Sequence, residues 1–292
     1  VSMSGFGHTG PQKDYVSYGP TLQALSGYTL LMRQEGHAPA GWGYSYADMS
    51  GGYSGALAVL MALWYRRRTG HGQFVDLSQF ETISSVIGPA MLDIMANGAT
   101  IAPFGNRSQE APAVPHGVYR CAGEDRWCAI TIFTEDEWRA FCQVMENPAW
   151  TGDPRFSTLA NRLQHQVELD RHVEQWTCHH TPEEIMTRLQ HVGVAAGLVA
   201  TGADMDRDPQ LRARGYWAQV RTPEGDTVTL DGPPIKLSAT QGAVSAPGPL
   251  LGEQTESVLR RLLNYTDADI AHLKAERVVA GHAEIVAERQ AV

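Results

Sequence analysis

Residues 43–55 read Gly-Tyr-Ser-Tyr-Ala-Asp-Met-Ser-Gly-Gly-Tyr-Ser-Gly, and they decide how the N-terminal part of the chain is interpreted. The stretch 49–68 that overlaps them predicts a helix, because apolar residues recur at helical spacing and three arginines end it. Asp48 then stands at the helix N-terminus, where aspartate is a preferred cap. The predicted apolar face consists of Leu57, Leu60, Met61, Leu63 and Trp64.

Glycines at 51, 52 and 55 are not explained if Asp48 serves only as a helix N-cap. Each glycine costs a helix interior about 1 kcal/mol relative to alanine. Glycine is tolerated where something bulky approaches the backbone. The pattern therefore leaves two interpretations of Asp48: an N-cap, or an exposed nucleophile that a large substrate must reach.

Length and composition are those of an ordinary acidic protein, and they agree with an enzyme. The chain has 292 residues, a net charge of −9 and a pI near 5.6, which argues against nucleic acid or an anionic membrane as a partner. No apolar run reaches the ~18 residues that span a bilayer. The four cysteines lack paired spacing, so we expect free thiols and a cytoplasmic protein.

Secondary-structure signals alternate along the chain. In the first part we expect a strand end at 1–4, helices over 20–31, 49–68 and 79–97, a strand over 73–77 and a linker over 99–115. A hairpin then follows (117–121 and 127–132), with helices filling 135–191 and a strand over 192–199. The last part predicts strands over 216–221 and 227–230 and helices over 253–263 and 267–276.

Three other motifs carry little weight. Gly5-x-Gly7-x-x-Gly10 matches the dinucleotide fingerprint, but no helix is predicted to open inside it, so we expect no nicotinamide site. Three consecutive residues, Cys178-His179-His180, cannot wrap one metal ion, so no metal site is predicted. Gly52-Tyr53-Ser54-Gly55 misses the spacing of a hydrolase nucleophile elbow.

Seven segments together resemble class III CoA-transferases, the family of formyl-CoA and carnitine-CoA transferases. They occur in the family's order, and the resemblance as a whole covers nearly all of residues 1–279. The segments are Ser4–Pro11, Ala24–Gly27, Ala47–Asp48, Arg68–Asp76, Gly105–Arg107, Pro115–Tyr119 and Pro249–Glu253.

The resemblance implies an α/β fold with a Rossmann-like large domain and a smaller α+β domain. We expect 1–100 to be the C-terminal part of the large domain, 105–200 the small domain, and 201–292 a linker that returns to the large domain. Family members carry a further segment before residue 1, so the chain is expected to be a C-terminal portion. Alone, it should leave helices 49–68 and 79–97 uncovered and be poorly soluble. The resemblance also implies an interlocked homodimer.

The same resemblance assigns roles to individual residues. Asp48 is the nucleophile that carries CoA from an acyl-CoA to a carboxylic acid, with no resident cofactor. The CoA site is expected at Ser4, Gly5, Phe6 and Gly7. Backbone N–H groups of Gly51 and Gly52 are predicted to stabilise the oxyanion. Tyr18 and His116 are possible substrate-loop residues, and the loop 99–116 is expected to shape the acceptor pocket.

Two alternatives remain open. Acyl-CoA racemases of the same superfamily use a histidine that precedes the aspartate, but the position that aligns through Ala24–Gly27 holds Tyr18. A tyrosine hydroxyl keeps its proton at neutral pH and is a poor shuttle. The other alternative is a non-catalytic CoA-binding fragment. The donor and acceptor acids cannot be read from the sequence.

Overall fold

The computed structural model describes residues 1–292 except 35, 100–104, 108–110, 224 and 291–292. It is a mixed α/β structure that divides into two units, Val1–Val199 and Ala200–Val292. The finer division predicted from the sequence, with a boundary near residue 100, stays a prediction.

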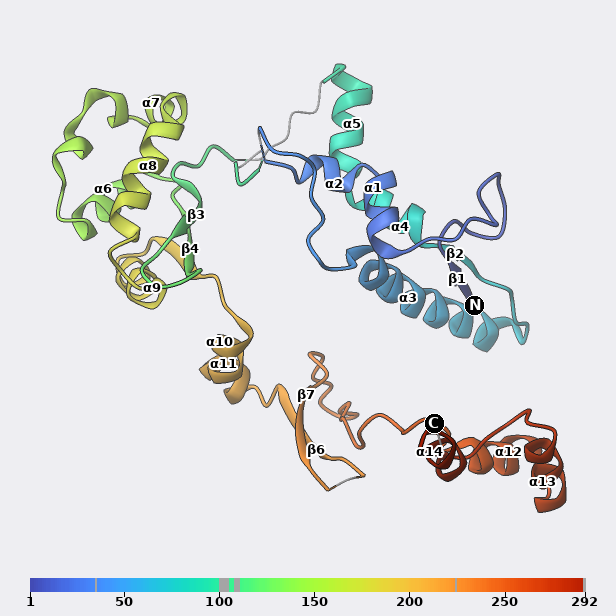
Figure 1. Ribbon diagram of the computed structural model, residues 1–292. Coiled ribbons are helices and arrows are strands. Elements are labelled where there is room, and N and C mark those ends of the chain that lie inside the picture. Colours follow the sequence, from blue (N-terminus) through green and yellow to red (C-terminus); the bar gives the residue numbers. More distant parts are fainter. Residues whose placement is uncertain (35, 100–104, 108–110, 224, 291–292) are drawn as a thin grey trace. The chain divides into compact units, whose positions relative to one another are not determined.

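A parallel pair of short strands organises residues 1–99 of the first unit. β1 (Ser2–Ser4) pairs with β2 (Asp76–Ser78), with Met3 opposite Leu77. Parallel neighbours need a crossover connection, and here the crossover contains three helices, α1 (Gly19–Leu25), α2 (Tyr28–Leu31) and α3 (Tyr46–Thr69). Figure 1 shows α3 running beside the pair. The carboxyl ends of both strands meet at one edge. A Rossmann-like sheet beyond this pair stays a prediction.

Two predicted helices are each broken in the structure. The predicted helix 20–31 is divided into α1 and α2 because Gly27 adopts a left-handed conformation (φ 85°), which ends a helix. The predicted helix 79–97 is divided into α4 (Gln79–Val86) and α5 (Gly88–Asn97). Pro89 falls in the first turn of α5 and lacks the N–H that would continue α4.

Helix α3 begins earlier than predicted. Its N-cap is Ser45, so Asp48 is the third residue of the helix and the N-cap interpretation is wrong. Gly70 (φ 78°) ends the helix, and its N–H donates to the carbonyl of Arg66 at 2.8 Å. The buried part of α3 is its N-terminal turn, at Ala47 and Gly51.

The apolar face predicted on α3 is exposed. Leu57, Leu60, Met61, Leu63 and Trp64 are between 43% and 64% exposed. Helix α5 is similar, with Met91, Leu92, Ile94 and Met95 exposed. Both helices therefore show the uncovered faces expected from the sequence.

The other part of the first unit contains a three-stranded antiparallel sheet in the order β3-β4-β5. Its strands are β3 (His116–Arg120), β4 (Trp127–Thr131) and β5 (Ala195–Leu198), which confirms the predicted hairpin and shortens the predicted strand 192–199. The helices are α6 (Glu135–Val144), α7 (Leu159–Gln164), α8 (Gln166–Thr177) and α9 (Pro182–His191), with 3₁₀ turns η1 (Ala149–Gly152) and η2 (Pro154–Phe156). Thr181 caps α9 and Pro182 takes its first position.

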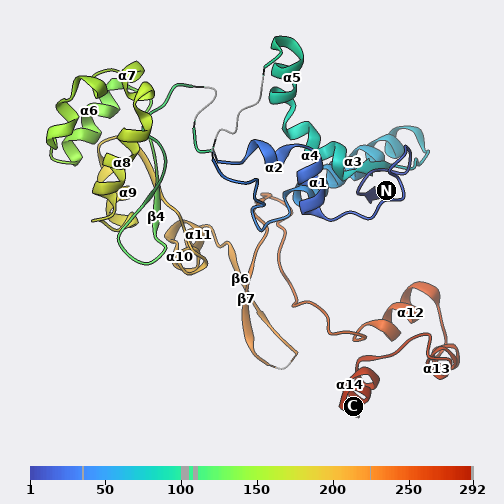
Figure 2. The ribbon, with the colours of Figure 1, turned by 45° about the horizontal axis from the view of Figure 1, so that its top comes forward.

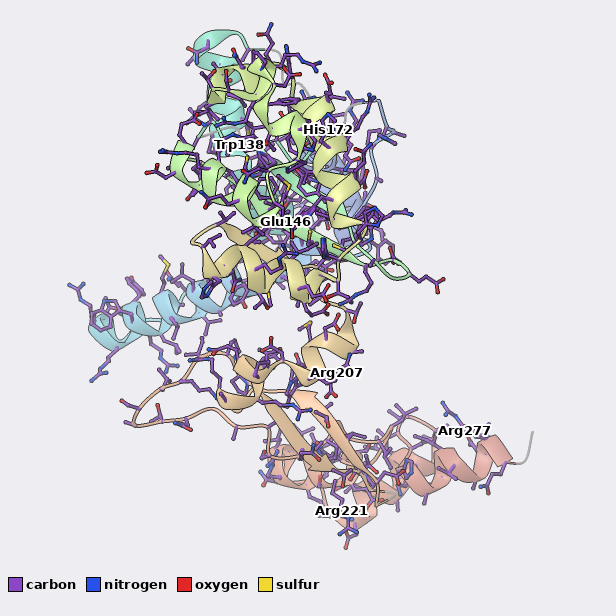
Figure 3. The ribbon with its side chains drawn as sticks, turned by 90° about the vertical axis from the view of Figure 1, so that its left-hand side faces the viewer. Trp138, Glu146, His172, Arg207, Arg221 and Arg277 are labelled. Carbon is purple, nitrogen blue, oxygen red and sulfur yellow. The ribbon has the colours of Figure 1, made fainter. Side chains whose placement is uncertain are left out.

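Side chains from this sheet and its helices form the main core of the unit. β4 alternates as a half-buried strand does, with Cys128 and Ile130 fully buried. Trp138 and Phe141 of α6 are buried in the same cluster, and Trp150 packs against it. Figure 3 shows Trp138 and His172 on the helices of this cluster.

One buried arginine ties three helical segments of this core together. Arg162 is 1% exposed and donates hydrogen bonds to Glu135 (2.8 and 3.1 Å) and to the carbonyl of Phe156 (3.1 Å). Its guanidinium lies 4.6 Å from the centre of the Trp138 ring. The hydrogen bond from Arg162 lowers the pKa of Glu135.

The second unit contains short helices and one antiparallel ribbon (Figure 2). The elements are α10 (Gly202–Arg207), α11 (Pro209–Ala213), β6 (Trp217–Arg221), β7 (Thr227–Asp231), α12 (Thr255–Leu263), α13 (Asp267–Ala275) and α14 (His282–Gln290). Helix α14 has no counterpart among the predicted elements. Lys274 links it to α12 through Glu284 (2.7 Å) and Glu256 (2.5 Å). Over the described residues, no helix combines the length and apolarity needed to cross a membrane.

We expect Arg162→Ala to lower the free energy of unfolding by about 3 kcal/mol, because the change removes a buried group that bonds Glu135 and Phe156 and leaves a cavity. Urea denaturation followed by tryptophan fluorescence measures this. The control is Arg139→Ala, whose side chain is 70% exposed and pairs with Asp136 on the surface; it should change stability little. Equal effects of the two substitutions would contradict the assigned role of Arg162.

Candidate active site

Asp48 lies in the first turn of α3 with its side chain exposed. N–H groups of a first turn stabilise negative charge. Over the described residues Asp48 forms no ion pair, and its Oδ1 accepts one side-chain hydrogen bond, from Nε2 of Gln79 at 3.4 Å. The carboxylate is thus held at one oxygen by a neutral donor and is neutralised by no cation.

Acidic groups with structural roles in this chain look different. Asp153 is bound by the guanidinium of Arg155 at 2.7 Å, and this bond lowers the pKa of Asp153 to about 2. Glu135 is bound by Arg162 in the same way. Within the described part of the chain Asp48 has no such charged partner, which fits a carboxylate kept available for chemistry.

Glycine 19 allows the N-terminus of α1 to approach Asp48. A Cβ on Gly19 would lie 2.6 Å from Oγ of Ser45 and 2.9 Å from Oδ2 of Asp48. Any larger residue would have to displace one of these groups. Tyr18, a predicted substrate-loop residue, directly precedes Gly19 and is 74% exposed. The structure therefore brings the backbone beside Tyr18 close to the nucleophile candidate.

The three glycines after Asp48 serve two different purposes. Positions 48, 51, 52 and 55 share one helix face because they are three, four and seven residues apart. A Cβ on Gly51 would lie 3.0 Å from Cγ of Gln79, and one on Gly55 would touch Met3 and Leu77 at ordinary contact distances. At Gly52 a Cβ would meet nothing within 4 Å. Two glycines thus pack α3 against its neighbours, and of the three only Gly52 lies open.

Helix geometry speaks against the oxyanion role predicted for Gly51 and Gly52. In an α-helix only the first four N–H groups lack an intrahelical acceptor. Helix α3 begins at Tyr46, so both glycines lie beyond that turn. Their N–H groups are directed at carbonyls four residues back and not at Asp48.

The predicted CoA-binding loop leaves the carboxyl end of β1. Oγ of Ser4 accepts a hydrogen bond from the N–H of Gly7 (2.9 Å), which has a positive φ of 82°. The carbonyl of Gly5 accepts from the N–H of Phe80 at 2.9 Å. A Cβ on Gly5 would lie 1.9 Å from Oγ of Ser17. The loop is therefore tightly built, at the strand edge where α/β proteins bind ligands.

Phe6 anchors this loop in a small apolar cluster. Its ring lies 5.6 Å from that of Phe80 and 6.2 Å from that of Tyr15. The cluster includes Leu22, Ala47 and Ile83. Packing through Ala47, the residue before Asp48, connects the loop to the first turn of α3.

The structure describes the surroundings of the Gly5–Gly10 and Cys178–His180 motifs. No helix opens within Gly5–Gly10, since α1 begins only at Gly19, so the fingerprint lacks its essential element. Cys178 follows the end of α8, and in the described part of the chain no group of three or more His, Cys, Asp or Glu side chains is arranged to hold a metal ion.

His116 belongs to a separate hollow of about 310 Å³. Its Nδ1 contacts the carbonyl of Asn106. In the same hollow the hydroxyl of Tyr119 donates to Asp170 at 2.7 Å, and burial raises the pKa of Asp170. No contact links His116 to the group around Asp48 in the described structure. Of the predicted acceptor loop 99–116, residues 100–104 and 108–110 lie outside the described residues.

Gln79 is the site residue that sequence reasoning missed. It directly follows β2 and opens α4, with Ser78 as the N-cap. A polar residue at the carboxyl end of a strand is a weak signal on its own. Its contact with Asp48 depends on the packing of α3 against α4, which the sequence does not reveal.

The chain belongs to CoA-transferase family III, whose family model matches residues 1–255. It is 30% identical over 279 residues to succinyl-CoA–D-citramalate CoA-transferase of Chloroflexus aurantiacus, covering 96% of this chain and 69% of that protein. It is 31% identical to a probable CoA-transferase of Mycobacterium tuberculosis, covering 97% of this chain but 36% of that protein.

A solved structure resembles the fold. The structure of a CAIB/BAIF family protein from Brucella suis matches with a TM-score of 0.78 and 26% identity, over 88% of this chain and 65% of that chain. The mixed α/β fold is therefore that of the family. The chain spans only part of the length of all three similar proteins.

Two glycine substitutions test the packing at this site. Gly19→Ala should lower the melting temperature, because its Cβ would collide with Ser45 and Asp48. Gly52→Ala should raise it, since the position is open and alanine favours a helix by about 1 kcal/mol. Thermal melts by circular dichroism measure both. If Gly19→Ala left the melting temperature unchanged, α1 would not approach α3 this closely.

Proposed function

We propose that the protein transfers CoA from an acyl-CoA donor to a carboxylic acid, with Asp48 as the nucleophile that carries CoA as an aspartyl thioester. The family membership and the names of the similar proteins support the reaction class. The observation that carries the assignment to Asp48 is its exposed carboxylate, which is approached by Gly19 and, among the residues that the structure describes, is bound by no cation.

The chemistry requires no general base. An ionised carboxylate is itself the nucleophile. One oxygen of Asp48 attacks the thioester carbonyl, the C–S bond breaks, and CoA departs as the thiolate. The product is a mixed anhydride between Asp48 and the donor acyl group. The thiolate then attacks Cγ of Asp48 and expels the donor acid as a carboxylate. The product is an aspartyl-CoA thioester.

The acceptor acid reverses these steps. Its carboxylate attacks Cγ and releases the thiolate, which gives a second mixed anhydride. The thiolate attacks the acceptor carbonyl, and Asp48 leaves as a free carboxylate together with the new acyl-CoA. Water must be excluded throughout, because hydrolysis of either intermediate would lose the thioester.

The surrounding elements suggest how substrates are held. We propose that Ser4, Gly5, Phe6 and Gly7 contact the CoA arm, because this loop and Asp48 both lie at the carboxyl edge of β1 and β2. Open space at Gly52 leaves room for the acyl group. The name of the Chloroflexus protein refers to succinyl-CoA and D-citramalate, and both acyl groups come from dicarboxylic acids. We therefore propose dicarboxylates as the first substrates to test.

Further features follow from the family resemblance. We propose that β1 and β2 are part of a Rossmann-like sheet, that the active protein is a homodimer, and that it works in the cytoplasm without a resident cofactor. The exposed apolar faces of α3 and α5 support an extensive interface.

Asp48→Asn should lower the transfer rate by about 10³-fold or more while the fold survives, because the amide has similar shape but cannot act as the anionic nucleophile. The assay uses the protein from its complete gene, with a panel of acyl-CoA donors and carboxylic acids. Asp136→Asn is the matched control, since Asp136 is another exposed aspartate in a first helical turn. An active Asp48→Asn variant would remove Asp48 from the mechanism.

The racemase alternative is tested by a separate experiment, deuterium exchange at the α-carbon of an acyl-CoA. With a 2-methylacyl-CoA in deuterated water and no acceptor, we expect no deuterium at the α-carbon, because Tyr18 occupies the position where a racemase has histidine. Rapid exchange by the unmodified protein would favour the racemase.

A further inference from the structure

We propose that the side-chain amide of Gln79 is a catalytic oxyanion donor for the steps at Cγ of Asp48, and that position 51 is glycine to admit this amide. The proposal rests on the proposed function of Asp48 and adds a residue to it.

The first observation is the contact between the two side chains. Nε2 of Gln79 lies 3.4 Å from Oδ1 of Asp48, at the long end of the hydrogen-bond range. A carboxylate has only acceptors, so the amide must donate through its NH₂ group. The donor therefore already points at an oxygen of the reacting carboxyl group in the resting protein.

The second observation is that secondary structure holds the backbone of Gln79 in place. Its backbone opens α4, where Oγ of Ser78 accepts from the N–H of Glu81 at 3.2 Å. Ser78 is in turn paired with Ser4 across the parallel strands. The base of the Gln79 side chain is thus held by a helix cap and a strand ladder, which suits a preorganised donor.

The third observation concerns Gly51, the residue of α3 that faces the side chain of Gln79. A Cβ on Gly51 would lie 3.0 Å from Cγ and 3.3 Å from Nε2 of Gln79. The glycine therefore leaves the space that the amide occupies. An alanine there would push the amide away from Asp48 or force the helix to move.

These contacts match where charge develops in the reaction. When one oxygen of Asp48 becomes the bridging atom of the anhydride, Oδ1 remains as the carbonyl oxygen on Cγ. Attack by CoA thiolate, and later by the acceptor carboxylate, puts negative charge on this oxygen. The Gln79 N–H then meets a forming oxyanion, and no proton transfer is needed. The initial attack on the acyl-CoA places charge on the substrate oxygen and is not assisted by Gln79.

The test measures formation of aspartyl-CoA from donor alone, by rapid quench, with the acyl-CoA that gives the fastest wild-type transfer. Gln79→Met keeps the length of the side chain but removes the donor. It should slow adduct formation by about 10²-fold, the usual effect of losing one oxyanion donor, while the Kd for the acyl-CoA stays within about threefold. Circular dichroism melts confirm that the variant is folded.

A double-mutant cycle tests the role of Gly51 independently. Gly51→Ala should slow the same step, and adding it to Gln79→Ala should cause little further loss, because the displaced amide is already absent. Gly55→Ala is the matched control, since a Cβ there would touch Met3 and Leu77 at ordinary distances and not Gln79; it should leave the rate unchanged.

The outcomes separate the proposed role of Gln79 from the proposed function of Asp48, on which it rests. If Asp48→Asn abolishes transfer but Gln79→Met forms the adduct at the wild-type rate, Gln79 is not the donor and the function of Asp48 stands. Additive effects in the cycle would overturn the role of Gly51. If Asp48→Asn remains active, the proposed function fails first.

Discussion

The absence of a Cβ at Gly19 and at Gly51 lets two other segments, the start of α1 and the side chain of Gln79, approach Asp48. Without a Cβ at Gly19, the start of α1 reaches within contact distance of the carboxylate. The bare backbone at Gly51 lets Gln79 lie against the first turns of α3. The arrangement depends on close backbone approach, which only glycine allows without displacement. Asp48 is thereby confined between a helix N-terminus and an amide, with its outer side exposed.

This site combines a fixed position with an uncompensated charge. The carboxylates of Glu135 and Asp153 are bound by arginines and stabilise packing. Asp48 has a neutral partner, so its charge is held in place without being neutralised. A nucleophile needs both properties, because a cation would reduce its reactivity and a mobile side chain would lose orientation.

Sequence patterns predicted the elements well where local signals are strong. The hairpin and the long helix α3 follow from alternation and periodicity. Helix breaks at Gly27 and Pro89 were missed because the apolar period continues across them. The motif order also led to the family. Gln79 could not be found, since its contact arises from packing between segments that are 31 positions apart. The closeness of Gly51 to Gln79 was not predicted for the same reason.

The central claim is that Asp48 carries CoA covalently. Its most direct test is peptide mass spectrometry of the protein from its complete gene, incubated with acyl-CoA donors including succinyl-CoA and with no acceptor acid. The account predicts a CoA thioester on the peptide that contains Asp48, which disappears when an acceptor acid is added as the new acyl-CoA forms. CoA transfer without any adduct, or an adduct on another residue, would contradict it.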